Sequence, residues 1–357
     1  MNSSAKPTID MTKPHYQRIL DAAQSQSPGL LGSALLNIDS GDYLHSTASS
    51  TASSEELSHW IDVAKALFAS QCEPFLVTDF SSLKNTKQAY LEFDDQSLAC
   101  VAIGQSPSPS LVILRDKAPL GMELSRAKEL SDLHPQRFDA LAKNPHYLDR
   151  DGVHSVSDLT GSGSAEQLCR VPYAAQELIS GLFGEAALPS LATLQMRHKL
   201  HLDRLLNAYI DNDRIKVIFQ RPRYLADHII ILVSNDHNSP AELAVNVRKC
   251  ADNVLRQLID DTLEQGINTD VSLAEDDQTW QSIVQELREL DRDDLLGVLE
   301  VGGFANHSLG DEGEMEAGAV VLRCAECIYY YPNRKWCDLP ELPVPVEPHW
   351  YCKLWKL

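Results

Sequence analysis

Four of the eight cysteines in this 357-residue chain lie in its last 34 residues, where they could bind one metal centre. They are Cys324, Cys327, Cys337 and Cys352, with the spacing C-x2-C-x9-C-x14-C. A C-x-x-C loop lets two thiolates reach the same centre while the backbone turns, and two further cysteines complete a set of four soft sulfur ligands. Such a set suits Zn²⁺ or an iron–sulfur cluster, and its binding would order an otherwise short, proline-rich tail.

Aromatic residues are concentrated around these cysteines. The tail holds seven of the 24 aromatic residues of the chain, which are Tyr329, Tyr330, Tyr331, Trp336, Trp350, Tyr351 and Trp355. Zinc is redox-inert and needs no dry surroundings, whereas the potential of a cluster depends on burial and on hydrogen bonds to its sulfurs. The aromatic residues therefore favour a cluster. A structural zinc ion is the alternative, and a metal-free tail, including one with paired cystines, is the third possibility.

The tail resembles the end of the high-potential iron–sulfur proteins. The resemblance rests on three segments, Cys324-Ala325-Glu326-Cys327-Ile328-Tyr329-Tyr330, Cys337-Asp338-Leu339-Pro340 and Trp350-Tyr351-Cys352-Lys353-Leu354-Trp355. It implies that the four cysteines hold a cubane [4Fe-4S] cluster and that Tyr329, Trp350 and Trp355 shield it. Two features depart from that family: the gap between the second and third cysteines is short, and Tyr351 separates Trp350 from Cys352.

The elements that must position this tail are predicted to be of the α+β type, within the broader α/β class. We expect two antiparallel-sheet domains with flanking helices, followed by the metal-stapled C-terminal tail. The predicted divisions are a flexible arm (1–13), a first domain (14–133), a linker (134–164), a second domain (165–322) and the four-cysteine tail (323–357). They follow hydrophobic periodicity and the Pro-, Gly- and Ser-rich stretches between periodic segments.

The first domain is predicted to run helix, two strands, helix, strands, helix. The expected elements are a helix over 15–25, strands over 30–38 and 43–47, a helix capped by Ser54, strands over 75–80, 89–93, 97–103 and 110–115, and a helix over 120–130. This order resembles the roadblock family, together with Pro28-Gly29-Leu30-Leu31-Gly32-Ser33-Ala34-Leu35-Leu36, the turn Asp39-Ser40-Gly41 and the helix over 55–71. The resemblance implies a five-stranded antiparallel sheet between helices, a homodimer or a docked protein partner, and no catalysis. An unrelated α/β domain is the alternative.

The second domain is predicted to mix helices and strands in a similar way. Helices are expected over 165–183 and 188–210, from Ser239-Pro240 onward and around Trp280, with strands over 214–221, 228–234, 295–301 and 317–322. His198 and His201 with Asp203 nearby, and Asp236-His237-Asn238, are more simply a solvated helix face and a turn. Neither a phosphate-binding glycine loop nor G-x-S-x-G is present, so no catalytic residue is assigned. An enzymatic site in this domain is an alternative without a motif.

Charge and hydropathy narrow the choice of partner and compartment. Lys and Arg number 31 against 51 Asp and Glu, and the resulting formal charge of −20 disfavours nucleic acid and anionic membrane surfaces. No apolar run approaches the roughly 18 residues of a membrane span, and Met1–Pro14 has no apolar signal core. We therefore expect a cytoplasmic protein, in which the scattered cysteines are buried free thiols.

The expected function is that of a cytoplasmic iron–sulfur protein in electron transfer or redox sensing, with a roadblock-like domain for dimerisation or docking. The alternative is a non-enzymatic scaffold or interaction protein whose tail is stapled by a structural zinc ion or a cluster.

Overall fold

The computed structural model shows an α+β protein, as the sequence predicts, and its chain forms two compact units. The sheet unit comprises residues 17–221 and 227–250, and the cysteine unit comprises residues 1–16, 222–226 and 251–357. The structure describes residues 7–68, 86–93, 96–102, 110–116, 153–157, 205–212, 214–235, 238–267, 273–274, 276–291, 293–306 and 322–357. Within these ranges, no helix is both long enough and apolar enough to cross a membrane.

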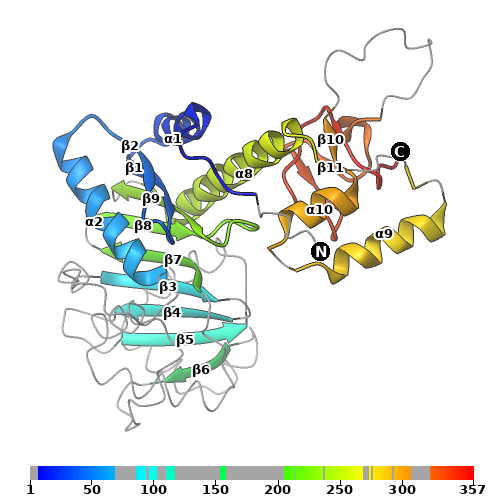
Figure 1. Ribbon diagram of the computed structural model, residues 1–357. Coiled ribbons are helices and arrows are strands. Elements are labelled where there is room, and N and C mark those ends of the chain that lie inside the picture. The colour runs from blue at the N-terminus through cyan, green and yellow to red at the C-terminus, as the bar shows by residue number, and fades with distance from the viewer. Residues whose placement is uncertain are drawn as a thin grey trace. The chain divides into compact units, whose positions relative to one another are not determined.

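The sheet unit is built on one nine-stranded sheet in which every pairing is antiparallel (Figure 1). Its strands are β1 (Leu30–Asn37), β2 (Tyr43–Thr47), β3 (Thr86–Phe93), β4 (Gln96–Ala102), β5 (Ser110–Asp116), β6 (Val153–Ser157), β7 (Leu205–Asn212), β8 (Ile215–Gln220) and β9 (His228–Asn235). Their order across the sheet is β2-β1-β9-β8-β7-β3-β4-β5-β6. Strands from both predicted domains therefore share one sheet, and β6 lies in the segment predicted as a linker.

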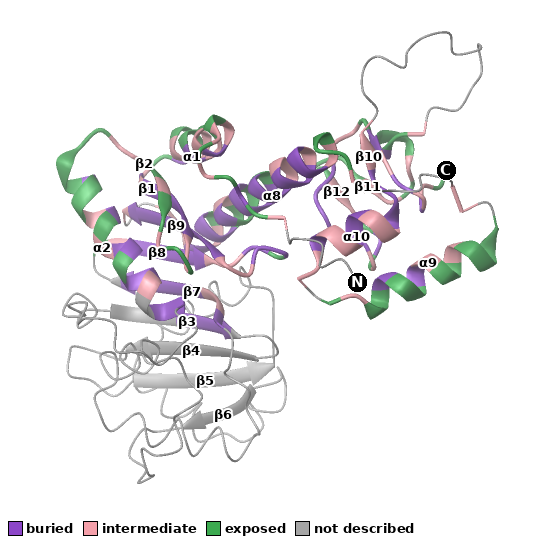
Figure 2. Ribbon diagram, in the orientation of Figure 1, coloured by how far each residue is buried: buried purple, intermediate pink, exposed green. Residues whose placement is uncertain are grey.

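The pairing of β1 with β9 corrects the expectation of two separate sheets. Leu36 of β1 lies opposite Ile229 of β9, and β1 has β2 on its other side. Residues 228–234 of β9 are all buried and β1 is nearly so, whereas β2 is half-exposed (Figure 2). Because an apolar strand gains most when it has neighbours on both sides, β1 and β9 lie inside the sheet and the polar β2 forms its edge.

Helix α2 (Thr51–Phe68) covers part of this sheet, because its apolar stripe meets β1 and β8. The rings of Trp60 and Phe68 lie 6.3 and 6.1 Å from that of Phe219. Gly32 permits a close approach, since a Cβ there would lie 2.9 Å from Leu57. The helix begins three residues before the expected cap at Ser54, because the hydroxyl of Ser50 accepts the N–H of Ser53.

The other predicted elements show where local sequence was informative. The structure has α1 (Pro14–Gln26), α8 (Pro240–Glu264) and α9 (Asp277–Glu289) where helices were expected, and β8 and β9 where strands were expected. Leu205–Ile210 belongs to β7, although a helix was predicted over 188–210. The predicted strand 75–80, the helices 120–130 and 165–183 and the strand 317–322 lie outside the described residues.

Residues 295–301 are a helix, so the prediction of a strand there is wrong. Helix α10 (Leu295–Gly302) begins where Asp294 accepts the N–H of Gly297 at 2.9 Å. It ends at Gly303, whose φ of 61° is the left-handed conformation that stops helices. A short apolar run fits a buried strand and a buried helix equally well, and here the two caps select the helix.

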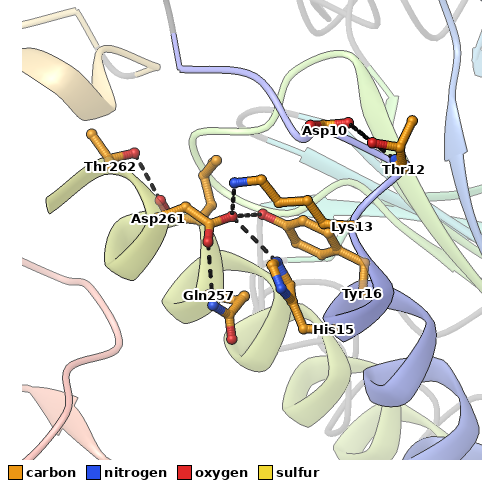
Figure 3. Close-up of polar contacts among 9 residues, drawn as sticks. Asp10, Thr12, Lys13, His15, Tyr16, Gln257, Asp261 and Thr262 are labelled. Carbon is orange, nitrogen blue, oxygen red and sulfur yellow. Dashed lines mark hydrogen bonds and ion pairs between the residues drawn. The ribbon is translucent and has the colours of Figure 1, made fainter. Parts of the chain in front are cut away.

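The N-terminal segment is attached to the cysteine unit, which corrects the expectation of a loose arm over 7–13. Ile9 is buried, and the residues that follow converge on Asp261 near the end of α8 (Figure 3). The hydroxyl of Tyr16 donates to Asp261 Oδ2 at 3.0 Å, and Lys13 Nζ lies 3.1 Å from the same oxygen. His15 Nε2 lies 3.3 Å away without hydrogen-bond geometry. Asp261 therefore holds Lys13 and Tyr16 against α8.

These contacts determine how Asp261 titrates. Burial alone would raise the pKa of Asp261, but the donors Lys13 and Tyr16, with the charge of His15, outweigh burial and hold its pKa below the ordinary value of 3.8. Burial, followed by the charge of Asp261, raises the pKa of Tyr16. The phenol is therefore a permanent donor at neutral pH.

Replacing Asp261 with asparagine is expected to lower the free energy of unfolding at neutral pH by about 1–3 kcal/mol, because Tyr16 loses a charged acceptor and Lys13 its counterion. The lowered pKa makes the contribution of Asp261 complete above pH 3.8 and lost as the pH falls through the folded-state value. Urea unfolding at neutral and acidic pH, with exposed Asp62→Asn as the control, should show a gap that closes in acid. An equal gap at every pH would contradict this role.

Candidate metal centre

The C-x-x-C segment forms a tight turn at the start of the tail. Residues Cys324–Glu326 are a single 3₁₀ turn, which the N–H of Cys327 closes by donating to the carbonyl of Cys324 at 3.0 Å. The N–H of Ala325 donates to the carbonyl of Pro348, which ties this turn to the strand before the fourth cysteine. The turn thus brings the first two thiols to the same region as Cys352.

The third cysteine lies at the end of a short hairpin. Strand β11 (Tyr330–Tyr331) pairs with β12 (Trp336–Cys337), and Tyr330 lies opposite Cys337. On its other side, the N–H of Cys337 donates to the carbonyl of Val344 at 3.0 Å. The middle of the stretch between the third and fourth cysteines runs antiparallel to β12 at Val344–Pro345, with turns on either side of it at 339–342 and 347–350, and the stretch buries Leu342, Val344 and Val346.

The fourth cysteine follows β13 (Trp350–Tyr351), which pairs with β10 (Ala305–Asn306) beyond the end of α10. The N–H of Lys353 donates to the carbonyl of Gly302, and that of Ile328 to the carbonyl of Lys356. Backbone hydrogen bonds therefore hold the tail both before Cys352, through β13, and after it, through Lys353 and Lys356.

All four cysteines line one pocket, although they come from three separate segments of the tail. Its cavity is small, at about 10 Å³, and its other walls are apolar or aromatic side chains, which are Phe304, Tyr329, Tyr330, Leu339, Val346, Leu354 and Trp355. No charged side chain of the described residues lines it. The fold therefore brings four cysteines to one pocket with apolar and aromatic surroundings.

The predicted shielding residues divide into two groups. Tyr329 and Trp355 line the pocket, whereas Trp350 is fully buried on β13 and does not. Tyr330 and Phe304 line the pocket without having been singled out as shielding residues. Tyr330 stands in a run of three tyrosines. Phe304 lies twenty residues before Cys324, and nothing local in the sequence marks it.

Burial and mutual repulsion disfavour the charged form of these thiols. Burial, followed by the charge of neighbouring cysteines, raises the pKa of Cys324, and burial raises that of Cys337 to about 11. Burial raises the pKa of Cys352 well above its ordinary value, with the other three thiols adding to the effect. Thiolates gathered in such a place need a cationic centre to balance their charge.

Two backbone donors act in the opposite direction. The backbone N–H of Leu339 lowers the pKa of Cys337, and the backbone N–H of Leu354 lowers the pKa of Cys352, although burial outweighs both. Both donors lie two residues after their cysteine.

Four thiols that line one apolar pocket fit a Cys₄ metal centre or an iron–sulfur cluster by the chemistry of the donor set. Within the described ranges, no three His, Cys, Asp or Glu side chains are yet arranged closely enough to hold a metal ion. Loading would therefore require the thiols to lose their protons and turn toward a common point.

The hairpin that carries Cys337 is fastened to the middle of α8 and to the segment before Cys352. Arg334 donates to both oxygens of Asp252, at 2.8 and 3.0 Å, and its guanidinium lies 3.6 Å from the centroid of the Trp336 ring. Lys335 Nζ lies 2.9 Å from Glu347, with φ of 51° at the tip of the hairpin. These contacts hold the tip of the hairpin against Asp252 of α8 and Glu347 of the tail.

The other residues that sequence reasoning considered contribute less. His198, His201, Asp203, Asp236 and His237 lie outside the described residues. Among the five described cysteines, Cys250 is a buried free thiol in α8, as predicted, and the four tail cysteines are also free. Comparison with protein-family models, curated proteins and solved structures finds no match for this chain.

Proposed function

We propose that the cysteine unit binds a [4Fe-4S] cluster through Cys324, Cys327, Cys337 and Cys352, and that the protein acts in electron transfer or redox sensing. The observation that carries this proposal is the single apolar pocket lined by all four cysteines. When bound, such a cluster supplies reversible one-electron chemistry.

The surroundings of the sulfurs support a cluster over a structural zinc ion. Tyr329 and Trp355 line the pocket, its other walls are apolar or aromatic, and burial raises the pKa of Cys324, Cys337 and Cys352. Burial adjusts a cluster potential, whereas zinc has no potential to adjust. The second candidate, a scaffold whose tail is stapled by zinc, is supported by the small size of the cavity.

The sheet unit is proposed to dock a protein partner or a second copy of this chain, as the roadblock resemblance implies. The supporting observation is that α1, β1, β2 and α2 follow one another in the chain as the resemblance implies, and that β1 and β2 pair in an antiparallel sheet. Strands β3–β6 extend that sheet beyond β7. The resemblance rests on residues 14–133, which contain β1–β5, and in the sheet β9, β8 and β7 lie between β1 and β3.

Compartment and partner class follow from charge and thiol chemistry. All five described cysteines are free, which supports the reducing cytoplasm. A net charge of −20 supports a partner other than nucleic acid or an anionic membrane.

Purification without air tests the proposal. We expect a brown protein that absorbs near about 400 nm and contains iron and sulfide, at roughly four of each per chain. Reversible reduction with an unchanged circular dichroism spectrum would favour electron transfer over stapling. The Cys250→Ala variant should keep the full iron content, because Cys250 lies in α8 outside the pocket. A colourless protein with one zinc per chain would contradict the cluster and support the scaffold.

A further inference from the structure

A second cavity of about 300 Å³ lies within the cysteine unit, apart from the thiol pocket. It is a half-open hollow lined by Arg223 and Tyr224, by the end of α9 and the residues after it, by Val298 of α10, and by Pro340 and Glu341. This volume falls at the lower end of the range for small-molecule sites. No residue of the proposed metal centre lines it.

The floor of this cavity is apolar and firmly held. Leu287 of α9 and Val298 of α10 are 6% and 4% exposed, and Tyr224 is 6% exposed beside them. Tyr224 has a φ of 63°, a left-handed conformation that costs a non-glycine residue about 1–3 kcal/mol. Such a conformation persists only where surrounding contacts impose it, so the loop that carries Tyr224 is held in a defined shape.

The rim carries four charged side chains, two of which neutralise each other. Arg288 donates through Nη2 and Nε to a single oxygen of Glu341, at 2.6 and 3.1 Å. This ion pair closes one side of the cavity between α9 and the tail. It leaves Arg223 and Asp291 to meet an incoming molecule.

Arg223 and Asp291 are the opposite charges that remain. The guanidinium of Arg223 lies 5.0 Å from the centroid of the Tyr224 ring, and no carboxylate of the described residues forms an ion pair with it. Asp291 accepts only a long backbone hydrogen bond, 3.3 Å from the N–H of Asp293, and has no cationic partner among the described residues. The last carbonyls of α9 end beside Asp291 and add negative potential there.

We propose that this cavity binds a small zwitterion with an apolar body, of the class of α-amino acids with an apolar or aromatic side chain. The carboxylate of the ligand meets Arg223, its ammonium group meets Asp291 and the C-terminal end of α9, and its side chain covers the floor of Leu287 and Val298. This assignment is independent of what the four cysteines bind.

Three matched probes test the assignment by calorimetric titration of the full-length protein. They are L-phenylalanine, 3-phenylpropanoate, which lacks the ammonium group, and 2-phenylethylamine, which lacks the carboxylate. L-Phenylalanine is expected to bind at least about tenfold more tightly than either analogue. Failure of all three to bind at about 10 mM, or equal binding of the three, would overturn the proposal.

Single substitutions assign each charge. Arg223→Gln should reduce the affinity for L-phenylalanine about tenfold and abolish its advantage over 2-phenylethylamine, and Asp291→Asn should abolish its advantage over 3-phenylpropanoate. Arg18→Gln, an exposed arginine of α1, is the matched control and should bind as the unaltered protein does. Thermal unfolding of each variant identifies loss of fold. Unchanged discrimination in folded Arg223→Gln and Asp291→Asn proteins would refute the assigned roles.

Discussion

Replacing Cys337 with alanine is expected to reduce the iron content to less than about a tenth and to make the last twenty residues sensitive to protease, while the sheet unit stays folded. The reason is that the hairpin, the extended stretch after it and the strand before Cys352 are short, and few of their hydrogen bonds form regular structure. Binding of a metal centre can contribute on the order of 10 kcal/mol to such a segment. Limited proteolysis followed by mass spectrometry, together with iron analysis, measures both effects.

Cys250→Ala is the matched control for this experiment, because it also removes a buried thiol but one that does not line the pocket. It should keep its iron and its resistance to protease. A tail that is equally resistant in the Cys337→Ala variant and the unaltered protein would show that the tail is ordered by its own packing. That packing includes Trp350 and Leu342, which are both fully buried.

A fragment of residues 14–133 is expected to show no cooperative unfolding transition. This fragment lacks β9, so β1 would keep β2 but lose its other neighbour along the whole register from Leu30 to Asn37. Leu30, Leu35 and Leu36 are buried in that strand, and each contributes about 1.5–3 kcal/mol when fully buried. Their sum is comparable with the entire stability of a domain, about 5–15 kcal/mol.

A fragment of residues 14–264 is the comparison, because it contains all nine strands with α1, α2 and α8. Thermal unfolding followed by circular dichroism should give a sigmoidal transition for this longer fragment and a featureless slope for the shorter one. If residues 14–133 unfolded cooperatively near the same temperature, the sheet order described above would be incorrect.

Local sequence predicted the elements of the fold better than their pairing. The alternation or clustering of apolar residues located β8 and β9, and Ser239-Pro240 located the start of α8, since these signals act within a few residues. The pairing of Leu36 with Ile229 joins segments almost two hundred residues apart, and no local signal encodes it. The segment 295–301 failed for a different reason, because a short apolar run has no decisive period.

The candidate site could be predicted as far as its cysteines, whose spacing alone singles them out. The structure brings these four residues to one pocket, and Tyr329 and Trp355 with them. The backbone N–H groups of Leu339 and Leu354, which lower the pKa of Cys337 and Cys352, could not be found in this way, because backbone groups leave no mark on residue type. Phe304 could not be predicted as a pocket residue, because, like the order of the strands, its position depends on the tertiary fold.

The segment that follows Cys337 forms a wall shared by two cavities. Leu339 lines the thiol pocket, and the next two residues, Pro340 and Glu341, line the cavity beside Arg223. If occupancy of one cavity shifts this segment, thermodynamic reciprocity requires that the two ligands change each other's affinity by the same factor. A single measurement, the affinity for L-phenylalanine with and without the metal centre, would therefore report the coupling in both directions.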